Sequence, residues 1–470
     1  MRIISGRLAA AVLIMSAILL SLRLPYSGEP AALALQDPAE PPQSKPSPEL
    51  IPPVSGAIAS ADVDQGTLKA IIDELVACGT RNSLSSWSDP KRGIGCARDR
   101  IVARFQAVSK ATGGNLLVRV DRFEATSSRT SNKPAPLENV VAILRGADPT
   151  LRATAFVVSG HYDSRASDVM DAAADAPGAD DDASGVAVSL ECARVLAARR
   201  PAGGYRASIV FAAVSGEEQG LLGGARLLEY LRQAGDTIGA MLDDDIVGAD
   251  FAPGAPHRVR VFSGSGPEGA DSPSRELARA VELIDSFQSV RLIFRTDRLG
   301  RGGDHLPFVE AGLPAVRFTE PLEDYHHEHQ APRVEDGVQY GDLAQYLNFE
   351  FMANVVRDNA EVLRELALAP APPGLITLSG AVTPTTVVSW RAPDDEDRAG
   401  FEVLWRETTD PRWSVYEFAP QAGEALLKGV STDNHFFAVR SVGRNGARSI
   451  AVAAAPKAVA PPGVPKSAAQ

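Results

Sequence analysis

Five short segments of this sequence place acidic residues or histidines beside expected strands and helices. The first, Gly160–Ser164, follows the strand-like run Thr154–Ser159, so His161 is expected at the end of a strand. Asp163 lies two residues further on, where a carboxylate can orient a metal-binding imidazole. Taken alone, this pair could equally be a surface histidine and aspartate in a turn.

The second and third segments bring carboxylates together. Asp180–Asp182 stand where a helix is expected to begin, and a single acidic residue is enough to cap a helix. Three adjacent carboxylates repel one another unless a cation offsets their charge. Glu217 and Glu218 follow the apolar strand Ile209–Val214, where one glutamate could bind a metal ion while the other accepts a proton from water. The alternative is a pair of solvated glutamates at the start of a helix.

The last two segments supply further oxygen and nitrogen ligands. Asp243–Asp245 end another strand-like run, and Tyr325–His329 contains three of the seven histidines. The three cysteines show no zinc-binding spacing, so histidines and carboxylates must supply the ligands of any metal. Together the five segments predict a metal site.

The net charge and the N-terminus indicate where the protein acts and which partners it lacks. The formal net charge is −12, and no lysine and arginine cluster could follow a phosphate backbone, so no nucleic-acid partner is expected. Arg2 and Arg7 precede the apolar stretch Leu8–Leu22, and Ala32–Ala34 offers a small-residue cleavage site. We therefore expect a signal peptide over residues 1–34, a secreted or periplasmic protein, and no stable membrane insertion after cleavage. The alternative is an uncleaved anchor.

The cysteines fit an exported protein. In an oxidising compartment Cys78 and Cys96, which flank a loop rich in glycine and serine, could form a disulfide. The alternative is two unpaired thiols. Cys192 lies in an apolar helical pattern and is predicted to be a buried free thiol.

The order of expected elements predicts two folded parts. Strands and helices alternate over residues 62–368, which is typical of an α/β sheet covered by helices on both faces. Residues 35–61 resemble a flexible, proline-rich lead-in, and the prolines within 369–375 a linker. Short alternating runs over 376–456 predict a small all-β sandwich, with a mobile tail over 457–470. Ligands of such α/β sheets bind where strands end and loops begin.

The five segments, in chain order over roughly residues 139–367, resemble those of the zinc exopeptidases that include bacterial leucyl aminopeptidases and glutamate carboxypeptidase II. The resemblance implies a mixed, mostly parallel sheet flanked by helices and two bound Zn²⁺ ions. It further implies an aminopeptidase that cleaves peptides with a free N-terminus, with a water held between the ions and Glu217 as general base. The alternatives are a carboxypeptidase or glutaminyl-cyclase-like activity on the same fold, and a non-catalytic binding protein.

The same resemblance implies a ligand for each position of the zinc site. The implied ligands are His161 and Asp245 for one ion, Asp181 between both ions, and Glu218 and His326 for the other. Asp163 would support the catalytic machinery beside His161. The family pattern also implies that the peptide bond between Asp181 and Asp182 is cis.

Two of these assignments leave alternatives open. Asp245 begins the family pattern Asp-x-x-Gly, but Asp243 and Asp244 stay possible. The Tyr-His order favours His326 over His327, although neither has the acidic residue four positions later that the family often shows.

Two further segments carry a resemblance. The segment around Gly303 resembles the family's S-D-H-x-x-F loop with glycine in place of serine, and His305 is expected to be a hydrogen-bonded scaffold residue. The C-terminal sandwich resembles a fibronectin type III domain through Trp390 and the alternating strand around Phe437. His435 stands where that family usually has a corner tyrosine, and the partner of the sandwich is unknown.

Overall fold

The computed structural model describes residue 54 and residues 56–251, 258–264, 271–285, 289–419 and 423–454. The expected signal peptide, the expected tail from residue 457 onward and most of the expected lead-in lie outside these residues. Residues 56–61 differ from the flexible lead-in that the sequence predicted, because Ile58 is buried in the apolar core. No described helix has both the length and the apolar character that crossing a lipid bilayer requires.

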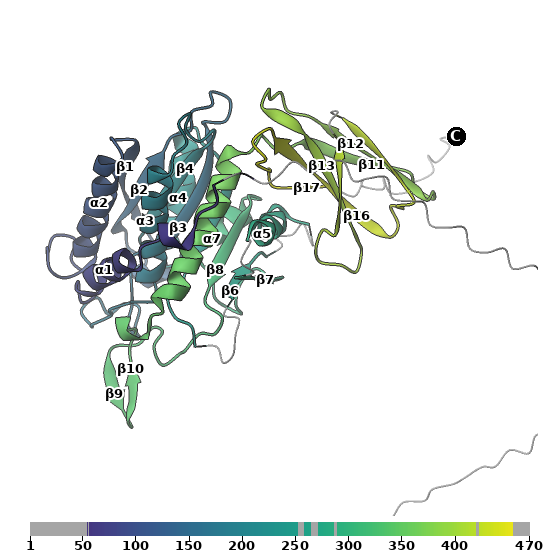
Figure 1. Cartoon of the computed structure of the whole chain (residues 1–470). Helices are drawn as coiled ribbons and strands as arrows, with labels where there is room; N and C mark the ends of the chain where they lie inside the picture. Colours follow the sequence, from purple (N-terminus) through teal and green to yellow (C-terminus); the bar gives the residue numbers. More distant parts are fainter. Residues whose placement is uncertain are drawn as a thin grey trace, which may run out of the picture. The chain divides into compact units, whose positions relative to one another are not determined.

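An eight-stranded mixed sheet forms the centre of the α/β part (Figure 1). Its strands, in the order β1-β2-β4-β3-β5-β8-β6-β7, are β1 Leu116–Ala125, β2 Ala135–Leu144, β3 Thr154–His161, β4 Ser208–Val214, β5 Thr237–Asp244, β6 Val259–Phe262, β7 Val290–Ile293 and β8 Ala315–Thr319. The central strands β4, β3, β5 and β8 are parallel neighbours, and antiparallel pairs join β1 to β2, β2 to β4 and β6 to β8. The predicted mixed sheet is therefore confirmed, and its four central strands end at one edge.

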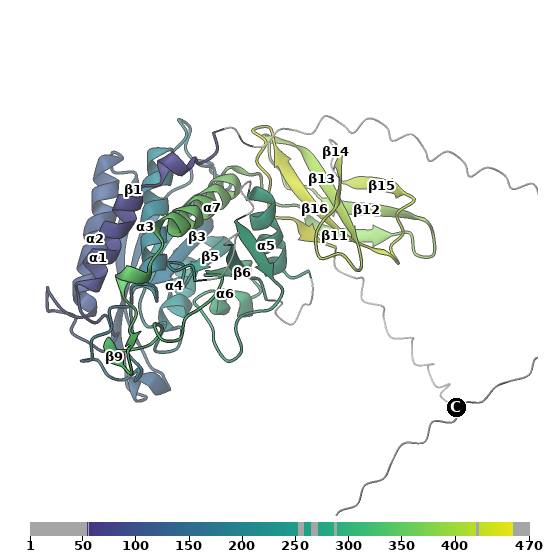
Figure 2. The same cartoon turned by 60° about the horizontal axis from the view of Figure 1, so that its bottom comes forward.

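Helices cover both faces of this sheet (Figure 2). The helices are α1 Gln65–Val76, α2 Ile94–Ala111, α3 Ala183–Ala198, α4 Leu222–Gln233, α5 Pro273–Ile284, α6 Leu306–Glu310 and α7 Phe349–Leu368. Successive strand residues point to opposite faces, so Phe156 and Val158 of β3 pack with α1, α2, α3, α5 and α7. Ala155 and Val157 pack with α4 and α6 on the other face. The α/β layers that the sequence predicted are thus confirmed.

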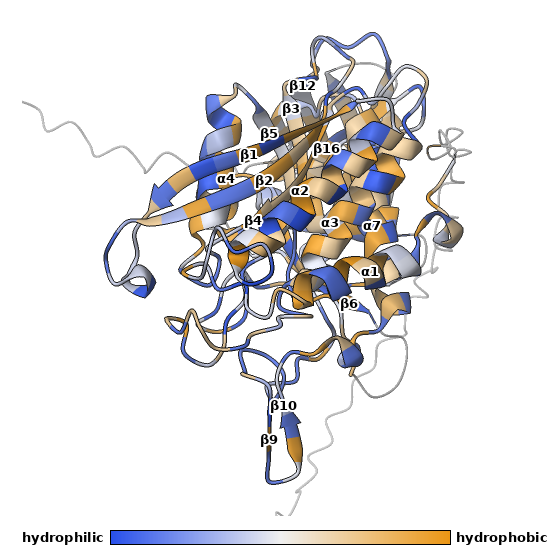
Figure 3. Ribbon diagram, turned by 90° about the vertical axis from the view of Figure 1, so that its left-hand side faces the viewer, coloured by the Kyte–Doolittle hydropathy of each residue, from blue (hydrophilic) through white to orange (hydrophobic). Residues whose placement is uncertain are grey.

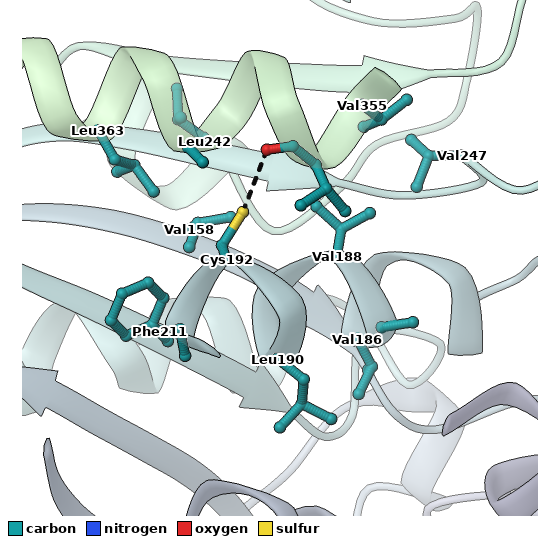
Figure 4. Packing of buried hydrophobic residues seen from close by; sticks show 14 of the residues in the cluster. Val158, Val186, Val188, Leu190, Cys192, Phe211, Leu242, Val247, Val355 and Leu363 are labelled. Atoms are coloured by element: carbon teal, nitrogen blue, oxygen red, sulfur yellow. Dashed lines mark hydrogen bonds between the residues drawn. The ribbon is translucent and has the colours of Figure 1, made fainter. Parts of the chain in front are cut away.

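The interior between α3 and α7 is apolar. In Figure 3 apolar residues concentrate where these helices pack on the sheet, while the surrounding loops are mainly hydrophilic. Cys192 of α3 lies in this core, and its thiol donates a hydrogen bond of 3.6 Å to the carbonyl oxygen of Val356 on α7 (Figure 4). The predicted buried free thiol is confirmed. Cys78 and Cys96 form the predicted disulfide, which ties the chain after α1 to the start of α2.

The region before α7 differs most from the expected pattern. The sequence pattern predicts a last helix over roughly Asp342–Ala367. In the structure α7 begins only at Phe349, because the Asn348 side chain caps it and accepts from the N–H groups of Glu350 and Phe351. A short helix, η3 Ala344–Tyr346, precedes it. A hairpin of β9 Arg333–Glu335 and β10 Val338–Tyr340 also lies in this region and projects from the domain in Figure 1. Its two-residue turn is Asp336-Gly337, with φ of 50° and 81°. This dipeptide is typical of β-hairpin turns, but a search for hydrophobic periodicity alone does not detect it.

The C-terminal part consists of two antiparallel sheets. One contains β11 Gly374–Ser379, β12 Thr385–Arg391 and β15 Glu424–Lys428; the other contains β14 Val415–Ala419, β13 Arg398–Glu407, β16 His435–Gly443 and β17 Val452–Ala453. Both sheets contribute to one apolar cluster, in which the rings of Trp390 and Phe401 lie 5.2 Å apart. The predicted all-β sandwich is confirmed in this sense.

Candidate metal centre

The candidate metal centre lies at the carboxyl ends of the four central strands. His161 is the last residue of β3, Asp245 directly follows β5, and Glu218 lies in the loop after β4. Asp181 lies in the loop that precedes α3, and His329 in the long connection after β8. Because the carboxyl ends of parallel strands meet at one edge, residues far apart in the sequence converge there.

The first group of side chains that could hold a metal ion consists of His161, Asp181 and Asp245. The Nε2 atom of His161 lies 3.1 Å from Oδ1 of Asp181 and 3.7 Å from Oδ1 of Asp245. All three side chains are buried. The structure therefore brings together the three residues that the sequence assigned to one ion.

The second group consists of Asp181, Glu218 and His329. The Nε2 atom of His329 lies 2.9 Å from Oδ2 of Asp181 and 3.2 Å from Oε1 of Glu218. Each oxygen of the Asp181 carboxylate thus faces a different histidine. Asp181, which the sequence assigned to the position between two ions, is the member that both groups share.

His326 lies outside both groups, so the prediction that it is the last ligand is wrong. Asp324 accepts a hydrogen bond of 2.9 Å from the His326 N–H and lies 2.8 Å from its Nδ1, and 55% of the His326 side chain is exposed. His327, the alternative, stacks on Tyr346 with ring centroids 3.7 Å apart. His329 takes the place instead, at a φ of 55° that turns the chain back toward the site.

One sequence signal could have excluded His326. An aspartate two residues earlier commonly forms a local turn with the following N–H groups, and Asp324 does so in this loop. No difference in residue type separates His327 from His329. Which of the two histidines faces the site depends on the path of the loop. That path is determined by packing and not by the periodicity of the sequence.

Asp163 supports both the histidine and the glutamates. The Nδ1 atom of His161 lies 3.1 Å from the main-chain carbonyl oxygen of Asp163 and 3.5 Å from its carboxylate. The carboxylate also accepts hydrogen bonds from the N–H groups of Glu217, at 3.4 Å, and Glu218, at 3.2 Å. Gly216, whose φ of 84° requires a glycine, lets the chain turn into this arrangement after β4. Asp163 is therefore a positioning residue for two strand ends.

Arg81, which the sequence analysis did not single out, holds two site loops together. Its fully buried guanidinium donates to the carbonyl oxygens of Tyr162, at 2.7 Å, and Gly178, at 2.8 Å. Ser83, two residues on, donates a hydrogen bond of 3.1 Å to the Asp163 carboxylate. Burial lowers the pKa of Arg81 to about 10, while the surrounding acidic residues oppose this shift. The loop between the bridged cysteines thus joins the His161 loop to the Asp181 loop.

The backbone around Asp181 is fixed by neighbouring carboxylates. The Asp342 carboxylate accepts hydrogen bonds of 2.8 Å from the N–H groups of both Asp180 and Asp181. The Asp182 carboxylate caps α3 through the Gly185 N–H, at 2.8 Å, and accepts from the His161 N–H at 2.9 Å. The peptide bond between Asp181 and Asp182 is cis, which confirms the expectation from the resemblance. The Asp180 carboxylate accepts a hydrogen bond of 2.7 Å from the Gly248 N–H, so Asp181 is the one of the three adjacent aspartates whose carboxylate faces the two histidines.

A fully buried arginine backs the first group. The Nη2 atom of Arg317 lies 2.9 Å from Oδ2 of Asp245, the oxygen that does not face His161, and its Nη1 atom lies 3.0 Å from Asp297. A Cβ atom at Gly303 would meet the Arg317 side chain at 3.0 Å and the Asp243 carboxylate at 2.7 Å. The glycine that replaces the family's serine thus makes room for this arginine.

His305 has the scaffold role that the sequence predicted. It is completely buried, and its main-chain N–H and its Nδ1 atom lie 3.0 and 3.2 Å from the Asp243 carboxylate. Asp243 is engaged with His305, and Asp244 accepts a hydrogen bond of 2.9 Å from Asn359, so Asp245 is the acidic residue of its run that reaches the first group.

The electrostatics of the two groups favour a cation. Burial opposes protonation of His161, but its contacts with Asp163, Asp181 and Asp245 raise the pKa of the imidazole well above its usual value. Burial likewise opposes protonation of His329, yet Glu218 and Asp181 raise its pKa to about 10.

Surroundings that favour positive charge on buried histidines also suit a divalent ion, which binds neutral imidazole and releases the proton. Oε1 of Glu218 is buried and lies 3.2 Å from Nε2 of His329, as expected of two atoms that would bind the same metal ion. The donor set of imidazole nitrogens and carboxylate oxygens therefore fits zinc.

A cleft of about 420 Å³ opens over both groups. Glu217 lines it and belongs to neither group, and its carboxylate accepts no hydrogen bond from a described residue. Burial raises the pKa of Glu217 well above its usual value, a shift that His161 opposes and Glu218 reinforces. The centre therefore combines two adjoining cation positions with a carboxylate that is available to exchange protons.

This arrangement of ligands and a free carboxylate on an α/β sheet is suited to metal-dependent hydrolysis. Residues 139–346 match the model of peptidase family M28. A probable zinc metalloprotease of Pyricularia oryzae is 40% identical over 444 residues, covering 87% of each chain. A second one, from Leptosphaeria maculans, is 39% identical over 414 residues, covering 83% of this chain and 94% of the relative. The chain belongs to the zinc metallopeptidases of family M28.

Solved structures with a similar fold include two from Legionella pneumophila. The LapA aminopeptidase is 17% identical at a TM-score of 0.47, over 65% of this chain and 72% of that one. LapB is 19% identical at a TM-score of 0.49, over 67% and 76% of the two chains.

Proposed function

We propose that this metallopeptidase is an exported two-zinc aminopeptidase. The observation that carries the proposal is the shared carboxylate of Asp181, whose two oxygens lie 3.1 and 2.9 Å from the Nε2 atoms of His161 and His329. A carboxylate with one histidine on each oxygen is suited to bridge two adjacent ions. His161 and Asp245 would complete one ion's ligands, and Glu218 and His329 those of the other.

Each group also has the supporting contacts that metal ligands need. The second nitrogen of His161 is fixed by the Asp163 carbonyl, which leaves Nε2 for the ion. Two bound zinc ions would supply Lewis-acid chemistry, polarising the scissile carbonyl and lowering the pKa of a water molecule.

Glu217 is the residue best placed to move protons. It lines the cleft beside both groups, and Asp163 anchors its backbone. Its carboxylate would accept a proton from the attacking water and donate it to the leaving amine, as general base and then general acid. The substrate would be a peptide whose free N-terminus lies within the cleft.

Export rests on the N-terminal segment and agrees with the Cys78–Cys96 disulfide, because disulfides persist in oxidising compartments. We further propose that the C-terminal sandwich is a fibronectin type III-like module. Its three- and four-stranded antiparallel sheets and the buried Trp390 support this reading.

The test combines the Glu217→Gln variant with a substrate panel. We expect the variant to lose roughly a thousandfold or more of its turnover of aminoacyl-arylamides while its zinc content stays unchanged. Normal turnover in this variant would overturn the assignment of Glu217.

The panel separates the rival activities. N-acetylated peptides cleaved in preference to aminoacyl-arylamides would indicate a carboxypeptidase, and cyclisation of N-terminal glutamine without cleavage a glutaminyl cyclase. A zinc-loaded protein that turns over none of these substrates would be a binding protein.

A further inference from the structure

Four arginines line the cleft over the metal centre, and two of them are neutralised. Arg298 lies 2.9 Å from Oε2 of Glu323, and Arg301 pairs with Glu323 and Glu328. Their charges are therefore balanced within the cleft wall.

Arg129 and Arg165 are held differently. Arg129, in the short helix η2 Ser128–Thr130 between β1 and β2, donates a hydrogen bond of 2.7 Å to the main-chain carbonyl oxygen of Glu218. No carboxylate of a described residue lies within ion-pair distance of its guanidinium, which is exposed to the cleft. Arg165 donates to the carbonyl oxygens of Ala166, at 3.1 Å, and Ser167, at 2.8 Å. Main-chain carbonyls fix the position of a guanidinium without neutralising its charge.

Arg165 also forms one long ion pair. Its Nη1 atom lies 3.7 Å from Oε2 of Glu218, and Glu218 is a ligand in the proposed second zinc site. Both arginines therefore lie against the same residue, one at its carbonyl and one at its carboxylate. They occupy the side of the cleft next to that site.

The charge balance of the cleft depends on these two residues. Its other charged groups are Asp181, Glu217, Glu218 and Asp245, whose four negative charges two divalent cations would offset. The positive charges of Arg129 and Arg165 would then have no compensating negative charge among the residues that line the cleft. Positive charge in a concave site with low-dielectric walls attracts anionic ligands. A guanidinium also matches a carboxylate through paired N–H donors.

We propose that Arg129, with Arg165, binds a carboxylate of the substrate, so that the enzyme prefers peptides with a carboxylate beside the scissile bond. This inference rests on the proposed aminopeptidase function. The carboxylate could be the C-terminus of a dipeptide or an acidic side chain at the second position. The chemistry that the two arginines recognise is the same in both cases.

Four peptides distinguish these sources. Leu-Leu against Leu-Leu-amide tests the terminal carboxylate, and Leu-Glu-amide against Leu-Gln-amide tests the acidic side chain. We expect kcat/KM to favour the charged member of at least one pair by about tenfold, mainly through KM, because a charge-assisted hydrogen bond in a partly open cleft is worth about that much.

The variant Arg129→Gln should bring this ratio close to one. Using the ratio removes any general effect on activity. Arg119→Gln is the matched control, because Arg119 is also exposed and also donates to a main-chain carbonyl, but lies on β1 outside the cleft lining. It should keep the wild-type ratio.

Equilibrium binding provides a readout that does not need turnover. In the Glu217→Gln background the charged peptide should bind about tenfold more tightly than its amide, and adding Arg129→Gln should remove the difference.

Equal kcat/KM within both pairs of the wild type, or an unchanged ratio in Arg129→Gln, would overturn the inference. The proposed aminopeptidase function would still stand in that event, because leucine would be released from the amides. If the zinc-loaded enzyme released leucine from none of the four peptides, the function itself would fail.

Discussion

The two halves of the metal centre are built in different ways. His161 and Asp245 of the first half lie at the ends of the adjacent strands β3 and β5, and only 2% of the His161 side chain is exposed. In the second half, His329 comes from a long loop and is 30% exposed. A ligand at the end of a buried strand inherits the rigidity of the sheet, whereas a loop ligand depends on the local course of the chain. We therefore expect the first half to bind its ion more tightly.

The largest expected effect comes from removing the residue that joins the halves. Asp181→Ala should abolish the binding of both ions and lower turnover by roughly a thousandfold or more, because each group loses a ligand. Zinc per chain, measured after dialysis, should fall toward zero. If the variant keeps one tightly bound ion, Asp181 serves only one half and the bridging assignment is wrong.

The next largest effect concerns the loop half alone. His329→Ala should weaken the second ion by more than about a hundredfold, since the loss of a ligand exceeds the ten- to hundredfold loss that outer contacts cause. Competition titration with a chelator should show one ion lost early and one retained.

The matched control is His326→Ala in the same loop, because the His326 side chain points to solvent beside Asp324. It should titrate like the wild type. Early loss of an ion from His326→Ala, with none from His329→Ala, would reverse the correction made from the structure.

A smaller effect is expected when the support of the strand half is removed. Arg317→Gln takes away the guanidinium behind Asp245 and should weaken the first ion by about ten- to hundredfold, leaving the second nearly unchanged. Zinc titration well below the unfolding temperature measures this difference.

Loss of a buried charge also destabilises the fold, so Arg279→Gln serves as the control. Arg279 is a buried arginine as well, paired with Glu276 and Asp271 away from the metal centre. It should lose stability but keep both affinities. Equal weakening of the first ion in both variants would mean that Arg317 acts through the fold alone.

The same difference between strand ends and loops explains which residues of the metal centre could be predicted from the sequence. His161, Glu218 and Asp245 were candidates because polar residues directly after apolar strands lie at the sheet edge. Asp181 was a candidate because three adjacent carboxylates at the start of a helix indicate a cation. The resemblance to the zinc exopeptidases then implied the role of each. His329 could not be found in this way, because the turn at Asp324 and the stacking of His327 decide which histidine faces inward.

The residues that support the metal ligands could not be predicted from sequence patterns either. Arg81, Asp342 and Arg317 act through hydrogen bonds and ion pairs between segments far apart in the chain, and nothing in their local sequence marks them. The sheet, its helices and the sandwich were predictable because burial imposes a period on the sequence. The start of α7 was not, because it depends on a single capping residue, Asn348.

The disulfide makes the order of the metal centre depend on the redox conditions around the protein. Closing a loop of this length stabilises a fold by about 3 kcal/mol, and the loop between Cys78 and Cys96 carries Arg81 and Ser83 to the His161 and Asp181 loops. In a reducing compartment both cysteines would stay thiols and that closure would be missing. The centre is then assembled from loops that no covalent link restrains. With the proposed export, peptidase activity would be coupled to passage into an oxidising compartment, because the disulfide forms there and the loops of the centre then gain their full order.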